Sequence, residues 1–306
     1  MTLITQMASD NDTSTTQSSA EHEIKRKYGN FYYDGPFADG KPNGMMRMYA
    51  KEIDKVSGYD GVEVMALRYK GYMVDGRRHG RGTQYYYMRR SFFGFSSLKK
   101  EYEGEWENGR YHGHGKYYSE SAGNHLVYEG EFKKGRYANG TLYHKPDGLT
   151  AKKQVAYSGK IKDGEMHGPA KAYDIKGQKI KGTFYHGKLK GGFKMYQHKS
   201  SKKICDIEHI NKKGIATGKF YDDDGELLFE GTRSVEIKYD DPFITEITIG
   251  PGYNEGTLYI RSGGTRLVGT FKGEKLLHGK VYDDDDECIS VIVNYLPIAP
   301  DSSDTE

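Results

Sequence analysis

The sequence predicts an all-β protein, an elongated and twisted single-layer stack of antiparallel β-hairpins. The main observation is a repeated motif: residues 102–117 and 69–85 each begin with a tyrosine that is followed by glycines 2, 7, 11 and 13 positions later. The second is an Asn-Gly or Asp-Gly pair in the middle of most copies. The third is the composition, which has 40 Gly and 27 Tyr but only 8 Pro. Self-similarity at a period of this length is typical of stacked units and not of a single globular core.

The first half of each copy reads as a strand. Alternate residues of a strand share a face, so Tyr102, Gly104 and Trp106 line one side while Glu103 and Glu105 point to the other. The glycine between two rings leaves a notch in which a ring or a neighbouring backbone can approach closely. We therefore expect the ring-lined side to be the packed one.

The middle of each copy reads as a tight turn. Asn108-Gly109 favours a type I′ hairpin turn, because both central residues of that turn need a positive φ. The same slot is held by Asp39-Gly40, Asp75-Gly76, Lys134-Gly135 and Asp163-Gly164. Each unit is then one small hairpin. An isolated hairpin is marginal in water, so the units must stack to bury their aromatic face.

Further copies begin at Tyr33, Tyr128, Tyr157 and Ile180, whereas those after residue 200 diverge, and Phe229-Glu230-Gly231 runs into an insertion. We expect about nine units, the last three divergent. The expected organisation is a disordered segment at 1–27, a regular array at 28–200 with insertions at 50–68 and 86–100, divergent acidic repeats at 201–295 and a flexible acidic tail at 296–306.

These copies resemble the MORN repeat family, most closely at the units that begin at Tyr69, Tyr102 and Tyr157. The resemblance covers roughly residues 33–196. It implies a non-catalytic scaffold in a cytoskeletal, flagellar or membrane-junction assembly, or peripheral binding of anionic phospholipid. Residues 164–177 also resemble the MORN region of a SET-domain lysine methyltransferase. We expect no room for that catalytic domain after Val281, so a degenerate relative of such an enzyme is the weaker alternative.

Charge is divided unevenly along the chain. Residues 25–219 hold 39 Lys and Arg against 20 Asp and Glu, whereas residues 220–306 hold 7 against 19. A stack lays sequence out in space, so we expect a basic body with an acidic end. The acidic clusters at 222–224 and 283–287 are expected to be solvated turns, the alternative being a contact with the basic body. The first lacks the spacing of an EF-hand loop, so no metal is expected there.

Two groups of residues are candidates for binding. Aromatic residues on the ring-lined strands are expected to be partly exposed along a groove and to contact a helix or peptide of a protein partner: Tyr69, Tyr102, Trp106, Tyr128, Phe132 and Tyr157. The second insertion interleaves rings with cations, which suits a membrane interface or a protein: Arg89, Arg90, Phe92, Phe93, Phe95, Lys99 and Lys100. The alternative for this insertion is a longer hairpin whose rings pack on the next repeat. Binding of nucleic acid is not expected.

The sequence does not predict an enzyme. Four histidines directly precede a repeat glycine and are read as positions of the repeat: His79, His112, His167 and His278. We expect no catalytic residue, no cofactor and no metal site. Cys205 and Cys288 form neither a disulfide framework nor a metal quartet, which favours a reducing, cytoplasmic compartment. The expected function is a scaffold that binds a protein partner, with association to the cytoskeleton or a membrane, and the alternative is binding of anionic phospholipid through the basic body. Open sheet edges at the ends of the stack favour self-association.

Overall fold

The computed structural model describes residues 26–54, 62–88, 97–120, 124–146, 153–240, 242–261 and 264–293, and these residues contain strands and turns but no helix. The N-terminal strands are β1 (Arg26–Tyr28), β2 (Phe31–Asp34), β3 (Phe37–Ala38), β4 (Lys41–Pro42), β5 (Gly44–Asp54), β6 (Val62–Val74), β7 (Arg77–Met88), β8 (Ser97–Glu107), β9 (Arg110–Tyr118), β10 (Leu126–Lys133) and β11 (Arg136–Tyr143). The others are β12 (Val155–Lys162), β13 (Glu165–Tyr173), β14 (Lys179–Tyr185), β15 (Lys188–Tyr196), β16 (Lys203–Ile210), β17 (Ile215–Tyr221), β18 (Leu227–Asp240), β19 (Phe243–Ile249), β20 (Tyr253–Tyr259), β21 (Arg266–Gly273), β22 (Lys275–Tyr282) and β23 (Cys288–Val293).

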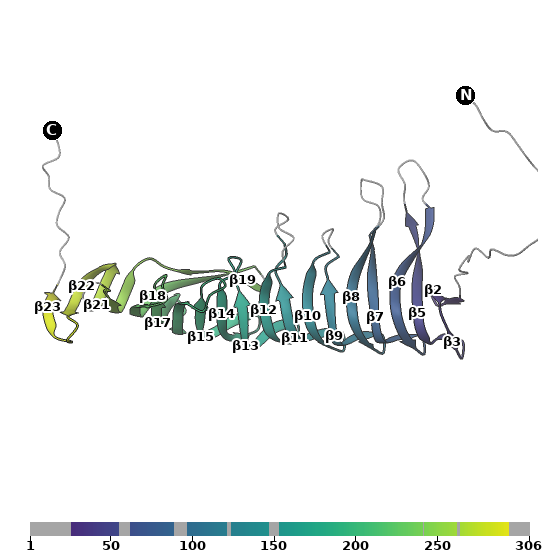
Figure 1. Ribbon diagram of the computed structural model, residues 1–306, viewed down its shortest axis with the longest axis horizontal. Coiled ribbons are helices and arrows are strands. Elements are labelled where there is room, and N and C mark those ends of the chain that lie inside the picture. Colours follow the sequence, from purple (N-terminus) through teal and green to yellow (C-terminus); the bar gives the residue numbers. More distant parts are fainter. Residues whose placement is uncertain are drawn as a thin grey trace, which may run out of the picture.

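The strands form one long antiparallel sheet in which neighbours along the chain are neighbours in space. From β5 to β18 each strand pairs with the next one, and the series continues through β20 to β23. The strands stand side by side along the long axis of the molecule (Figure 1). The predicted all-β stack of antiparallel hairpins is confirmed.

The hairpin turns follow the chemistry expected of them. Asn108 and Gly109 have φ values of 51° and 82°, as a type I′ turn requires. The four equivalent pairs also have two positive φ values each: Asp39-Gly40, Asp75-Gly76, Lys134-Gly135 and Asp163-Gly164. His186-Gly187 is a further turn of this kind, which the sequence analysis missed because histidine is a weaker turn residue than Asn or Asp.

The repeat glycines face one another across each hairpin and lie under the ring of the leading tyrosine. Gly104 is opposite Gly115 in the register, and a Cβ atom on Gly104 would lie 2.5 Å from both the Gly115 Cα and the Tyr102 hydroxyl. Gly71 and Gly82 are related to Tyr69 in the same way. The predicted notch at the repeat glycines is therefore confirmed, and the tyrosine of the same unit fills it.

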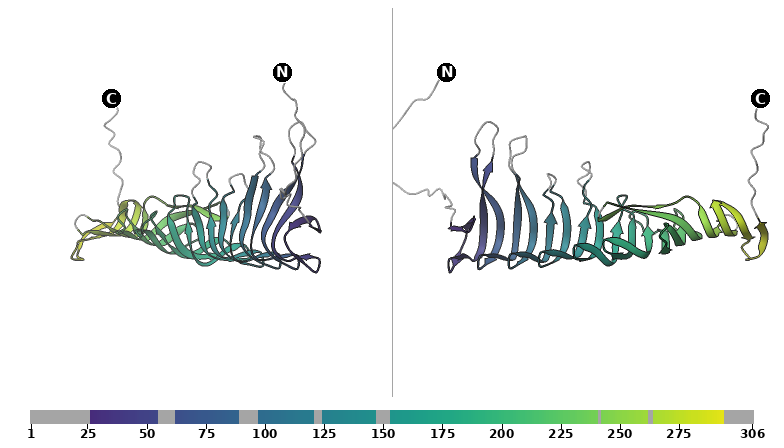
Figure 2. Two further views of the ribbon diagram at one scale, coloured as in Figure 1. Left: turned by 45° about the vertical axis from the view of Figure 1, so that its right-hand side comes forward. Right: turned by 180° about the vertical axis from the view of Figure 1, so that it is seen from behind.

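The strands bend along their length, so that the sheet forms a trough (Figure 2). Its inner face carries one continuous row of buried side chains that ends in the C-terminal units. In the first units this row is a lattice of rings: Tyr102 stacks on Tyr111 with ring centroids 4.0 Å apart, and Trp106 meets Tyr102 edge-on at 5.1 Å. Ring-on-ring and ring-on-backbone packing here replaces the thick core of a two-layer fold.

One hairpin leaves the stack. After its pairing with β17 and β20, strand β18 continues as residues 235–240 and pairs there with β19. We call residues 235–249 the arm. It runs lengthwise across the strands of the array, and its strand β19 contacts β12 and β13 (Figure 1). The insertion that follows Gly231 is thus a second layer over part of the trough.

The first insertion lengthens a hairpin. Residues 50–54 continue β5 and pair with residues 62–66 of β6, and residues 55–61 lie outside the described part of the chain. In the described residues, no helix has the length and apolar character needed to cross a membrane.

Candidate functional site

The six aromatic residues expected to be partly exposed are buried, and this expectation was wrong. Tyr69, Tyr102, Tyr128 and Tyr157 have no exposed surface, and Phe132 and Trp106 are 1% and 3% exposed. The sequence correctly places them on one face, but the bend of the strands closes that face over them. They build the floor of the trough and are not available for contact with a partner.

Each of these tyrosines is fixed by its hydroxyl group. The Tyr102 hydroxyl donates to the carbonyl oxygen of Glu105 at 2.7 Å, just where the strand register shifts, and the Tyr128 and Tyr157 hydroxyls do the same to Glu131 and Lys160, at 2.8 Å each. Burial raises the pKa of Tyr128 and of Tyr157 to about 12. The tyrosines are therefore neutral structural donors.

The trough widens where the ring lattice ends. Tyr111 and Tyr137 stack on the leading tyrosines of their units, but the equivalent position is held by Met166 in the next unit. Opposite Tyr157 lies Ala172, where Tyr117 lies opposite Tyr102. Smaller side chains leave space above the floor in this part of the trough. The arm occupies that space with Ile244 and Ile247, which are 2% and 6% exposed.

The arm touches both walls of the trough. On one side, the Ile175 N–H donates to the Thr245 carbonyl at 3.2 Å, and Lys176 forms an ion pair with Glu246 at 2.9 Å. On the other, the Leu189 N–H donates to the Tyr239 hydroxyl at 3.2 Å. Backbone hydrogen bonds and apolar side chains thus hold an extended segment inside the array.

The N-terminal part of the trough contains a cavity of about 580 Å³. Its lining combines apolar, cationic and anionic side chains: Phe31, Tyr33, Met48, Ala50, Glu52, Arg68, Met73, Arg77, Arg78, Gln84, Tyr85 and Glu101.

The charged residues of this cavity contact rings and one another. Arg78 lies 4.4 Å from the Trp106 ring centroid, and burial lowers the pKa of its guanidinium. Arg68 pairs with Glu52, and the Gln84 amide donates to Glu101 at 2.6 Å. We call this cavity the open trough. Its charged and amide side chains form no motif in the sequence, because they are scattered over the four strands β5 to β8.

The outer face of the sheet carries charged side chains. Lys171, Lys181 and Lys194 lie directly opposite one another on β13, β14 and β15. Further toward the N-terminus, Glu129 lies between Lys116 and Lys153, at 3.2 and 2.9 Å. Like charges directly opposite each other in a sheet are destabilising, and of the three only Lys194 has a carboxylate partner among the described residues, Asp206 on β16 at 2.8 Å. We call residues 171, 181 and 194 the lysine row.

The second insertion falls mostly outside the described residues. Arg89, Arg90, Phe92, Phe93 and Phe95 all lie there. The described ends of this hairpin are the strands β7 and β8, on which Tyr87 and Leu98 lie opposite each other. Lys99 of β8 lies opposite Tyr86 of β7, and Lys100 forms an ion pair with Glu103 at 2.8 Å.

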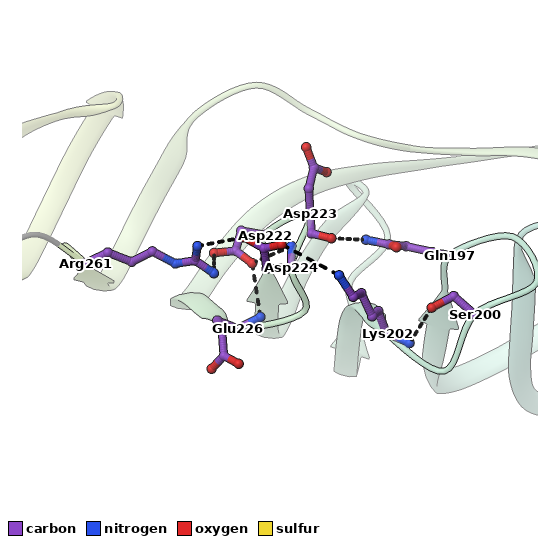
Figure 3. Close-up of polar contacts among 8 residues, drawn as sticks. All are labelled: Gln197, Ser200, Lys202, Asp222, Asp223, Asp224, Glu226 and Arg261. Atoms are coloured by element: carbon purple, nitrogen blue, oxygen red, sulfur yellow. Dashed lines mark hydrogen bonds and ion pairs between the residues drawn. The ribbon is translucent and has the colours of Figure 1, made fainter.

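The acidic clusters are turns, as expected, but cations pair with them, and one of these cations, Lys202, belongs to the basic body. Asp222 and Asp224 both pair with Arg261, and Asp224 also lies 3.6 Å from Lys202 (Figure 3). The Asp222 carboxylate accepts the N–H groups of Asp224 and Glu226 at 2.9 and 3.0 Å, which fixes the loop between β17 and β18. Asp283 closes the β22–β23 turn in the same way by accepting the Glu287 N–H at 2.9 Å.

The described residues show no group of three or more His, Cys, Asp or Glu side chains arranged to hold a metal ion. His112 pairs with Glu107 at 3.3 Å, and His167 packs on Tyr185 with ring centroids 5.2 Å apart. Cys205 is buried, and burial raises the pKa of its thiol to about 12, whereas Cys288 is exposed.

Comparison with known proteins agrees with the repeat structure. A search of curated proteins found no match to the chain. The family model of the MORN repeat matches four segments, residues 69–88, 102–121, 128–138 and 157–178. These segments cover the hairpins with the tyrosine-over-glycine packing described above. The chain therefore carries MORN repeats at these four segments.

Proposed function

We propose that the protein is a non-catalytic MORN-repeat scaffold that binds an extended segment of a partner protein in the open trough. The observation that carries this proposal is the arm, because it is a segment of chain already seated in the same trough. Its docking combines a backbone hydrogen bond to Ile175, buried Ile244 and Ile247, and one ion pair. The open trough offers the same elements: apolar side chains that are not fully buried, Phe31, Ala50 and Tyr85, and charged walls.

Site-specific photo-crosslinking tests the proposal. A benzophenone amino acid is placed at Ala50, in the lining of the open trough, or at Met45, which is 60% exposed and lines a groove on the outer face. In native lysate, the Ala50 position should capture one discrete protein, whereas the Met45 position should not. A Phe31→Asp substitution in the same cavity should reduce the capture by Ala50. If both positions capture the protein equally, or if Phe31→Asp does not reduce the capture by Ala50, the partner does not bind in the open trough.

The lysine row supports a second candidate function, binding of anionic phospholipid by the outer face. Lys194 pairs with Asp206, but Lys171 and Lys181, which lie opposite each other, gain interaction energy when an anionic surface neutralises them. We expect flotation with vesicles that contain phosphatidylserine, reduced by the double substitution Lys171→Gln/Lys181→Gln. Since the Debye length falls from about 8 Å at physiological salt to about 3 Å at 1 M, the binding should fade as salt is added. Binding in the open trough by apolar contacts should persist.

A further inference from the structure

A third surface, separate from the open trough and from the lysine row, lies at the edge of the sheet where three successive connections meet. It is a cavity of about 840 Å³ between the start of β12, the β13–β14 turn and the β15–β16 turn. Its charged lining is entirely cationic: Lys153, Lys176, Lys179 and Lys199. Polar side chains complete it, among them Gln154, His198, Ser200 and Ser201. We call it the lysine pocket.

The carboxylates near the pocket leave two of its four cations uncompensated. Glu129 pairs with Lys153 and Glu246 pairs with Lys176, at 2.9 Å each. Within the described residues, Lys179 and Lys199 have no carboxylate partner. Lys179 lies 4.5 Å from the Tyr196 ring centroid, which orients the chain but does not cancel its charge.

The two turns are locked together, which holds the cations in place. The His198 ring nitrogen Nδ1 donates to the Gly177 carbonyl at 3.0 Å. A Cβ atom on Gly177 would collide with the His198 ring, so glycine is required for this contact. Lys199, next in the chain, has a φ of 51°, a conformation that residues with longer side chains seldom adopt. The backbone is thus strained at the residue that carries an unpaired cation.

We propose that the lysine pocket binds a ligand that bears two or more phosphate groups. Several fixed ammonium groups and hydroxyl donors around one cavity match the charge and the acceptor oxygens of phosphates, and lysine binds phosphate as a point charge. The volume lies in the range of about 300 to 1,000 Å³ that is usual for small-molecule sites. The ligand is either a soluble polyphosphate or a phosphorylated lipid headgroup, and the two share this chemistry.

The arm is coupled to the pocket through one residue. Glu246 accepts from Lys176 and also from Lys238, at 2.9 and 3.0 Å. A bound phosphate competes with Glu246 for Lys176. Removal of the Glu246 charge therefore strengthens phosphate binding, whereas a variant that merely disturbs folding would weaken it.

The test measures binding by the full chain at physiological salt, with inositol hexakisphosphate in calorimetry and with vesicles that contain phosphatidylinositol 4,5-bisphosphate in flotation. Lys179→Gln/Lys199→Gln should weaken binding at least about 10-fold, since charge-assisted hydrogen bonds are lost. Lys212→Gln/Lys213→Gln is the matched control, because it removes the same charge from exposed residues of another turn and should change affinity less than about 2-fold. Glu246→Gln should tighten binding.

The two probes distinguish the sources of the phosphate. Pocket-dependent binding of the soluble probe identifies a free polyphosphate, and pocket-dependent binding of the vesicles alone identifies a lipid headgroup. Equal losses in the two double variants, or no binding of either probe by the unmodified chain, would overturn the proposal. The outcome is independent of the crosslinking result, because no residue of the lysine pocket lines the open trough.

Discussion

At the scale of single residues, the tyrosine and the glycine pair of each unit act together. The glycines have no Cβ atom, the ring takes the space, and the hydroxyl satisfies a carbonyl where the register shifts. Neither residue is explained by strand propensity, because glycine weakens a strand and a buried tyrosine needs a hydrogen-bond partner. Together they give a densely packed inner face, which needs no second layer in the units that the arm does not cover.

A pair of neighbouring substitutions tests this packing. Gly104→Val should destabilise the protein by about 1 to 3 kcal/mol, because its Cβ atom meets the Gly115 backbone and the Tyr102 hydroxyl. Glu103→Val should change the stability by less than about 0.5 kcal/mol, since Glu103 is on the outer face in a solvent-exposed pair with Lys100. Chemical denaturation of both variants gives the comparison. Equal denaturation midpoints for the two variants would mean that the packed face and the outer face of this strand have been assigned wrongly.

The buried tyrosines also predict a dependence on pH. An ordinary tyrosine has a pKa of about 10, whereas burial raises the pKa of Tyr128 and Tyr157 to about 12. A folded state that holds its proton more tightly than the unfolded state is fully stabilised below pH 10 and loses that stability as the pH rises from 10 to 12. The melting temperature should therefore fall over that window. The loss should be smaller in Tyr128→Phe/Tyr157→Phe, which is less stable at neutral pH but has fewer groups to ionise.

At the scale of elements, hairpins and turns could be predicted but the position of the arm could not. Asn-Gly and Asp-Gly pairs determine a turn locally, so four such turns were predicted correctly, and a fifth, Lys134-Gly135, was predicted from its place in the repeat. The alternation of Val235, Ile237 and Tyr239 with Glu236, Lys238 and Asp240 likewise indicates a strand. What the arm covers depends on Ala172 and Met166, which lie some 60 residues away in the sequence. The same non-local cause explains the six aromatics: their face could be predicted, but the bend that buries them could not.

The docking of the arm has its own test. Ile247→Asp places a charge at a buried position of β19, whereas Thr248→Asp places it at the exposed neighbour. A buried, unpaired charge is strongly unfavourable, so the first variant should release the arm. Hydrogen exchange should then accelerate at the Ile175 and Leu189 amides, which the arm protects. The second variant should leave that exchange unchanged. If the protection of these two amides is unaltered in both variants, the burial of Ile247 does not hold the arm in place.

At the scale of the whole molecule, the trough, the lysine row and the lysine pocket lie on one continuous sheet. The division of charge along the chain is partly compensated within the acidic end itself, because Arg261 and Arg266 pair with the acidic turns there. The basic body contacts the acidic end through the pair of Lys202 with Asp224 and through the arm. Such a rigid framework presents several surfaces at fixed distances, which is how a scaffold differs from a single binding site.

The two ends of the sheet differ in a way that predicts self-association. At the N-terminal end β1 carries Arg26 and Lys27, charges of the kind that protect a sheet edge from further pairing. At the other end β23 is uncharged, and its Ile289, Val291 and Val293 are 59%, 59% and 63% exposed. Among the described residues β23 pairs with β22 alone, so its outer backbone groups can pair with β23 of a second chain. Because that strand has no charge of its own, no like charges lie directly opposite each other when two copies of β23 pair. Light scattering after size exclusion should therefore show a concentration-dependent dimer.

Ile289→Lys/Val291→Lys should shift the equilibrium from dimer to monomer. Met45→Lys, which adds a cation at an equally exposed residue of the outer face, should not. A monomer at all concentrations, or a dimer that both substitutions leave intact, would assign the exposed strand no role in assembly.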